Sequence, residues 1–76
     1  MKVTLRRFET LLQGELPAAQ QTLYKWSSKK KVDWLGREGP SGHRGRELWA
    51  DVHKYNTWAE PRGHRLLFVE PGRATN

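Results

Sequence analysis

The chain has 76 residues, enough for one small domain and near the lower limit for a self-sufficient hydrophobic core. It contains no cysteine, which excludes disulfide bonds and thiolate metal sites, and no apolar run approaches the ~18 residues of a membrane span. Fourteen lysines and arginines against eight acidic residues leave a net charge of +6. That excess predicts a polyanionic partner such as DNA, RNA or an acidic surface, and the alternative is a basic protein that is merely soluble.

One domain is expected over residues 1–76, with a C-terminal extension over about 64–76 that either binds a partner or is partly disordered. Hydrophobic residues make up 36% of the chain, but they include four Trp, two Tyr and two Phe, so large rings can supply much of the buried area. Residues 1–12 form an amphipathic segment rather than a signal-peptide core. Together with the absence of cysteine, this predicts a cytoplasmic protein without a membrane partner.

The first predicted element is a short helix at the N-terminus. Thr4 can cap it by accepting a hydrogen bond from an early backbone N–H. Gln13-Gly14 supplies the end, because glycine adopts the left-handed conformation at little cost. One face of this helix is apolar and carries Leu5, Phe8, Leu11 and Leu12.

A second helix is expected from Pro17 to about Ser28, because proline is preorganised for the first turn of a helix. The stretch "QGEL" separates the two helices, a brief connection that contains glycine. This spacing is typical of a helix-turn-helix. The inward face of the second helix is predicted to carry Ala19, Leu23 and Trp26.

The outward face of the second helix favours nucleic-acid binding. Glutamine can pair with adenine and lysine can reach guanine in the major groove, while a lysine run suits phosphates. The alternative is a solvated helix face whose basic end is favoured by the helix dipole. The predicted DNA-binding residues here are Gln20, Gln21, Tyr24, Lys25, Ser28, Lys29 and Lys30, followed by Lys31.

Beyond Lys31 the pattern indicates a β-hairpin, with strands over "VDWLG" and "RELWA". The glycine-rich segment 36–45, "GREGPSGHRG", is then its tip, or wing, where basic side chains can follow a minor groove or phosphates. The inward residues are predicted to be Val32, Trp34, Leu48 and Trp49. The predicted DNA-binding residues of the wing are Arg37, His43, Arg44 and Arg46.

A third helix is predicted to begin after Asp51, a suitable N-cap, and to end at Pro61. Its buried face is expected to carry Val52, Tyr55 and Ala59, with Trp58 completing it. The apolar run Leu66–Val69 follows, either as an added strand that covers the core or as an exposed edge for a partner or a second copy. The predicted fold class is therefore α+β, a small winged helix-turn-helix.

The sequence "TLYKW" on the second helix, the Gly/Arg-rich wing and "GRELW" on the return strand resemble the small phage excisionases, the Xis and Cox proteins, within the MerR-like winged-helix class. The resemblance covers roughly Val3–Glu60. It implies base-reading roles for Gln21, Thr22 and Lys25, and wing contacts for Arg44 and Arg46. These families bind repeated DNA sites, often cooperatively, bend the DNA and steer an integrase towards excision, and several repress a promoter. The implied partners are double-stranded DNA, an integrase and further copies of the chain, in a bacterial host that carries the phage.

One stretch departs from that pattern. Many excisionases leave the second helix through a Gly-x-(Leu/Ile)-Pro turn, whereas this chain reads "KKKVDWLG". That version, with "ELP" before the helix, also resembles the N-terminal DNA-binding domains of the phage Mu transposase and repressor. A small phage transcriptional regulator is a related alternative.

The sequence also bears on two other classes of function. An enzyme is not expected, because the chain has no cysteine nucleophile, and His43, His53 and His64 are too far apart for a helical zinc pair. No catalytic residue, metal or cofactor is therefore predicted. A small protein that binds and inhibits a host protein is the third hypothesis, with Trp58 and Leu66–Val69 as its interface.

Overall fold

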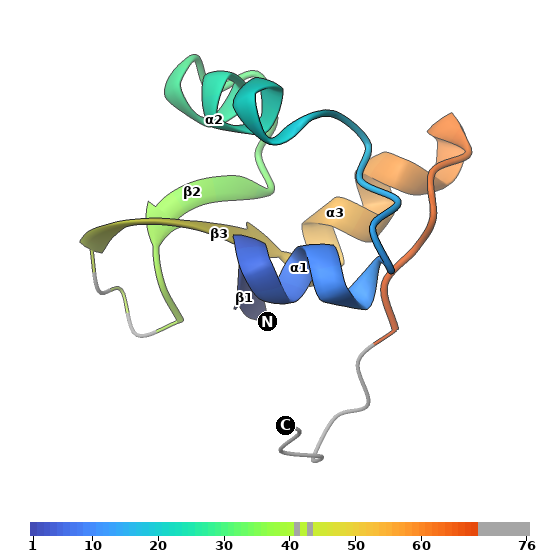
Figure 1. Ribbon diagram of the computed structural model, residues 1–76, viewed down its shortest axis with the longest axis horizontal. Coiled ribbons are helices and arrows are strands. Elements are labelled where there is room, and N and C mark those ends of the chain that lie inside the picture. The colour runs from blue at the N-terminus through green and yellow to red at the C-terminus, as the bar shows by residue number, and fades with distance from the viewer. Residues whose placement is uncertain (41, 43, 69–76) are drawn as a thin grey trace.

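A three-stranded antiparallel sheet lies at the centre of the structure, and helices surround it (Figure 1). The computed structural model describes residues 1–40, 42 and 44–68. Within those residues the chain is a small α+β domain with three α-helices. In chain order, the elements are β1 (Lys2–Thr4), α1 (Leu5–Leu11), α2 (Gln20–Ser28), β2 (Leu35–Glu38), β3 (Arg44–Asp51), α3 (Val52–Ala59) and a 3₁₀ turn (Glu60–Arg62).

The β2–β3 hairpin confirms the strands expected on either side of the glycine-rich segment, although β2 begins at Leu35 rather than at Val32. Its register shifts between Gly36 and Glu38, which marks a bulge or an irregularity in the pairing. β1 is absent from the elements predicted above. It pairs with the other side of β3, with Val3 opposite Ala50, and makes β3 the central strand.

The ends of α1 follow the local signals in the sequence. The Thr4 hydroxyl accepts a hydrogen bond from the Arg7 backbone N–H at 3.1 Å, which confirms the N-cap. At the other end both Gln13 and Gly14 have positive φ, 54° and 82°. The Gly14 N–H donates to the Glu9 carbonyl at 3.0 Å and closes the helix.

α2 begins at Gln20, three positions later than Pro17, so the predicted start is wrong. Residues 12–19 instead form a connection in which Leu16 and Ala18 pack against the core. Ala19 is the N-cap and has extended backbone, with φ −63° and ψ 154°, so the helix begins only after it, and Ala19 itself is exposed rather than inward.

A cluster of aromatic rings lies within the core. Trp34 is 1% exposed and lies 5.5 Å from Phe8, 4.9 Å from Tyr55 and 5.1 Å from Trp58, centroid to centroid. Phe8 and Tyr55 meet edge to face at 4.9 Å. Such contacts add to the free energy of area burial. Aliphatic side chains complete the buried set: Leu5, Leu12, Leu23, Leu35, Leu48, Ala50, Val52, Ala59 and Leu67.

Trp49 is not part of this core, which corrects the expectation that it packs inward. Leu48 and Ala50 are both fully buried, and successive side chains of a strand point to opposite faces, so Trp49 points away from the core. There its ring lies against Gly39, where an added Cβ would be 3.2 Å from the indole. Trp26, also expected inside, is half-buried and meets Trp34 at the margin of the cluster.

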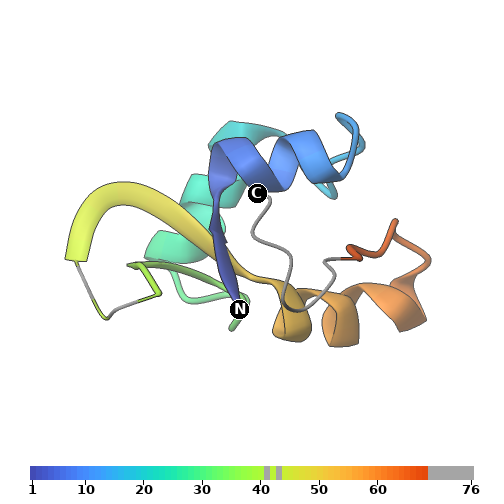
Figure 2. The same cartoon turned by 90° about the horizontal axis from the view of Figure 1, so that it is seen from below.

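α3 continues from the end of β3 (Figure 2). It begins at the expected cap, because the Asp51 carboxylate accepts from the Lys54 backbone N–H at 3.0 Å. α3 ends at Ala59, just before the expected stop at Pro61. Pro61 lies within the 3₁₀ turn, and the chain reverses at Gly63, whose φ is 76°.

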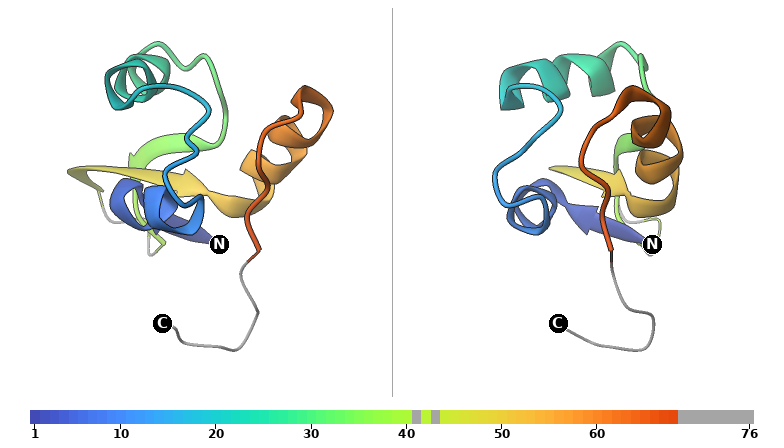
Figure 3. Two further views of the ribbon diagram at one scale, coloured as in Figure 1. Left: turned by 45° about the vertical axis from the view of Figure 1, so that its right-hand side comes forward. Right: turned by 90° about the vertical axis from the view of Figure 1, so that its right-hand side faces the viewer.

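The described residues after Gly63, 64–68, return alongside α3 (Figure 3) and form no strand. Leu67 is 2% exposed and belongs to the core, whereas Phe68 is 84% exposed; Val69 lies outside the described residues. Burial raises the pKa of the Tyr55 hydroxyl, which donates to the Arg65 carbonyl at 2.6 Å. In the described part of the chain, no helix is long and apolar enough to cross a bilayer.

Candidate nucleic-acid interface

One face of α2 carries an exposed polar stripe of Gln21, Tyr24, Lys25 and Ser28. These residues are three and four positions apart, so they form a single row along the helix. Leu23, on the opposite side, is fully buried and fixes which face is outward. The row, called the recognition stripe below, contains amide, hydroxyl and ammonium groups that can hydrogen-bond base edges.

Gln20 and Thr22, two of the residues predicted to contact bases, do not belong to the recognition stripe. The Gln20 amide donates to the Glu9 carboxylate at 3.2 Å and joins α2 to α1, so this side chain is engaged within the protein. Thr22 is half-buried. Both residues therefore border the stripe, and Gln20 helps hold the two helices together.

The helix ends in a basic turn, Lys29–Lys31, whose three side chains are exposed. The Lys31 N–H donates to the Trp26 carbonyl at 2.9 Å, across Lys30, which has a φ of 53°. Left-handed backbone costs a residue with a Cβ about 1–2 kcal/mol relative to the right-handed form. Glycine would adopt this conformation without strain. The lysine at this position instead places a positive charge at the end of the helix.

Arg37 of β2 connects the recognition stripe to the hairpin. Its guanidinium lies over the Tyr24 ring, 5.6 Å from the centroid, and donates to the Arg46 carbonyl at 3.1 Å. One side chain thereby contacts α2, β2 and β3. This contact was not foreseen, because Tyr24 and Arg37 are brought together only when β2 packs beside α2.

The remaining predicted wing residues are less completely described. Arg46 is exposed on β3, and Arg44 begins β3 opposite Glu38. The side chain of Arg44 and all of His43 lie outside the described residues. Next to them, the Gly42 N–H donates to the Gly39 carbonyl at 3.0 Å, with a φ of 74° at Gly42.

The surface considered for a host-protein inhibitor is partly used inside the fold. Trp58 contacts Trp26, Trp34 and Tyr55 and is half-buried, and the His64 ring stacks on it at 5.2 Å. Among the described residues, no group of three or more His, Cys, Asp or Glu side chains could hold a metal ion. Phe68 remains as an exposed ring.

No protein-family model matches the chain, and searches of curated proteins and of solved structures gave no significant match.

Proposed function

We propose that the protein binds double-stranded DNA in a sequence-specific manner, as a winged helix-turn-helix domain. α2 is the recognition helix and the β2–β3 hairpin is the wing. The observation that carries the proposal is the exposed recognition stripe, joined through Arg37 to the hairpin and followed directly by the basic turn Lys29–Lys31.

The dimensions and chemistry of this surface support the assignment. An α-helix with its side chains is about 10–12 Å across, so α2 (Gln20–Ser28) fits a major groove about 12 Å wide. Gln21 and Lys25 are one turn apart and can reach neighbouring base pairs. The lysines that follow would meet phosphates, where charge matters more than geometry.

The biological role proposed from the excisionase resemblance is control of recombination direction, with DNA bending and promoter repression as accompanying activities. The net charge of +6 and the glycine-rich hairpin tip are compatible with that role. A DNA footprint beside the gene distinguishes the roles. Repeated protected sites next to an attachment site favour recombination control, and a single site over a promoter favours repression.

The binding experiment starts from duplexes selected by the full chain from a random library. Each variant is then titrated against the selected duplex and a scrambled one. Lys25→Ala and Gln21→Ala should each weaken binding to the selected duplex by about 1–3 kcal/mol and affect scrambled DNA much less. Arg46→Ala should weaken both alike and lower the salt slope by about one unit.

Arg6→Gln is the matched control, because it removes one positive charge from an exposed position on α1 outside the proposed interface. Equal losses for Lys25→Ala and Arg6→Gln on both duplexes would show that only net charge matters. The assignment of α2 as recognition helix would then be wrong.

A further inference from the structure

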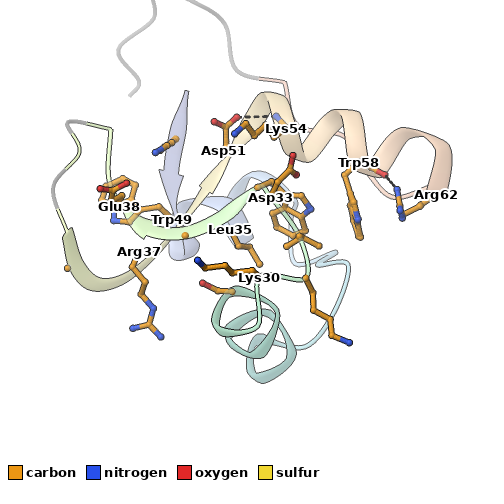
Figure 4. Close-up of a pocket in the computed structure, with 17 residues that line it drawn as sticks. Lys30, Asp33, Leu35, Arg37, Glu38, Trp49, Asp51, Lys54, Trp58 and Arg62 are labelled. Carbon is orange, nitrogen blue, oxygen red and sulfur yellow. Dashed lines mark hydrogen bonds between the residues drawn. The ribbon is translucent and has the colours of Figure 1, made fainter.

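A groove of about 960 Å³ lies between the C-terminal end of α2 and α3, on the face of the sheet that carries Trp49 (Figure 4). Three acidic residues line it, Asp33, Glu38 and Asp51, and the Asp51 carboxylate already caps α3. Six basic residues outnumber them: Lys2, Lys30, Lys31, Arg37, Lys54 and Arg62. The groove therefore carries an excess of positive charge.

The cations stand on two opposing walls. Lys30 and Lys31 come from the turn that ends α2, and Lys54 and Arg62 come from α3 and the turn after it (Figure 4). Arg62 is held in place, since its guanidinium lies 4.8 Å from the Trp58 ring centroid and donates to the Trp58 carbonyl at 2.7 Å. An extended anion between the walls would meet positive charge on both sides.

The floor of the groove leaves room for close approach. Gly36 of β2 and Gly45 of β3 line it, although glycine inside a strand weakens the sheet. A Cβ added at Gly36 would meet nothing within 4 Å, and one at Gly45 would meet only the Glu47 backbone nitrogen, at 3.9 Å. Neither glycine is required by internal packing. Glycine inside a strand marks a bulge, as at Gly36 where the register shifts, or a place where a ligand can approach the backbone.

We propose that this groove binds the sugar–phosphate backbone of the DNA that flanks the base-reading contact, so that α3 is part of the DNA interface. The proposal rests on the proposed function. Lys30 and Arg37 belong both to the groove and to the surface described above, which makes the two continuous. Phosphates suit these cations, because a phosphate contact depends on charge and reach rather than on a fixed hydrogen-bond geometry.

The experiment measures the salt dependence of DNA affinity for the full chain and for two groove variants. Lys54→Gln removes a cation from the α3 wall and leaves intact the backbone N–H that Asp51 caps. Lys30→Asn removes a cation from the α2 wall. Asparagine tolerates the positive φ of this position, so the backbone is not strained further. Each should weaken binding to selected and scrambled duplexes alike and reduce the salt slope by about one unit.

Arg6→Gln again serves as the charge-matched control, since Arg6 does not line the groove. A second readout is the indole N–H resonance of Trp49, which lines the groove and should shift when duplex DNA is added. Melting temperatures at or above that of the parent protein establish that the variants stay folded and that the loss is one of binding.

The outcomes separate the two proposals. If the parent protein binds no duplex, both fall. If Lys25→Ala loses sequence preference while Lys54→Gln matches Arg6→Gln, with the Trp49 resonance unmoved, DNA binding stands and the groove proposal is overturned. A salt slope lowered by Lys54→Gln and Lys30→Asn, but not by Arg6→Gln, supports it.

Discussion

At the scale of single residues, Asn56 explains how the C-terminal segment is held without a strand. Its side-chain amide donates to the Leu67 carbonyl and its oxygen accepts from the Leu67 N–H, both at 2.8 Å. A hydrogen-bonded residue pair of an antiparallel sheet exchanges the same two bonds. The amide thus satisfies the backbone of a residue that is 2% exposed.

Asn56→Asp tests this role, because a carboxylate keeps the acceptor for the Leu67 N–H and loses the donor to its carbonyl. The unmatched carbonyl should lower the free energy of unfolding by about 1–3 kcal/mol, measured by urea denaturation at neutral pH. The control is Thr57→Ala at the next, exposed position, expected to change stability by less than about 0.5 kcal/mol. Equal midpoints for the two variants would mean that the Asn56 bonds contribute nothing.

At the scale of elements, boundaries set by local chemistry were predictable and those set by packing were not. α1 has its cap and its glycine stop in the sequence, and the structure has both. β1 is three residues long and becomes a strand only beside β3. α2 begins three residues after Pro17, in a connection where Leu16 packs against the core, and no local pattern reveals that contact.

The candidate interface was also predictable only where local patterns determine it. The recognition stripe follows from helical spacing once Leu23 is placed inside. Strand alternation could also have separated Leu48 from Trp49, since adjacent residues of a strand cannot both face one core. The Tyr24–Arg37 contact and the groove required the positions of α2, β2 and α3 relative to one another.

The basic turn after α2 gives a prediction in which stability and binding change in opposite directions. Lys30→Gly relieves the left-handed strain at a φ of 53° and should raise the free energy of unfolding by up to about 1 kcal/mol. The same change removes a cation and should weaken DNA binding.

Lys29→Gly is the matched control, because Lys29 has a φ of −93° and gains nothing from glycine. It removes the same charge and should lower stability. Thermal melts of the two variants, with DNA titrations beside them, provide the comparison. A lower melting temperature for Lys30→Gly would contradict the strain argument.

At the scale of the whole molecule, the fold depends on rings drawn from every part of the chain. Trp34 precedes β2 and contacts Phe8 from α1, Trp26 from α2 and both Tyr55 and Trp58 from α3. Aromatic side chains supply large buried areas per residue, which a domain of 76 residues with 36% hydrophobic content requires. The tryptophan content predicts such a core, whereas its members follow only from topology.

Trp34→Ala should therefore cost about 3–5 kcal/mol, close to the total stability of a small domain, and leave the chain largely unfolded. Trp26→Ala should cost less and leave a folded protein, because the Trp26 side chain is half-buried. Near-UV circular dichroism and urea unfolding distinguish the two. Cooperative unfolding of Trp34→Ala at the parent midpoint would show that the ring cluster does not hold the domain together.

Two C-terminal truncations test whether residues 64–68 belong to the folded domain. Removing residues 64–76 takes Leu67 out of the core and deprives Asn56 and Tyr55 of their hydrogen-bond partners. The loss of one buried leucine alone costs about 2–5 kcal/mol, so this truncation should abolish the cooperative melt. Removing residues 69–76 leaves all of these contacts in place and should preserve both the melt and DNA binding. If the chain without residues 64–76 stays folded and loses only cooperative assembly on DNA, Leu66–Phe68 form an assembly surface rather than part of the core.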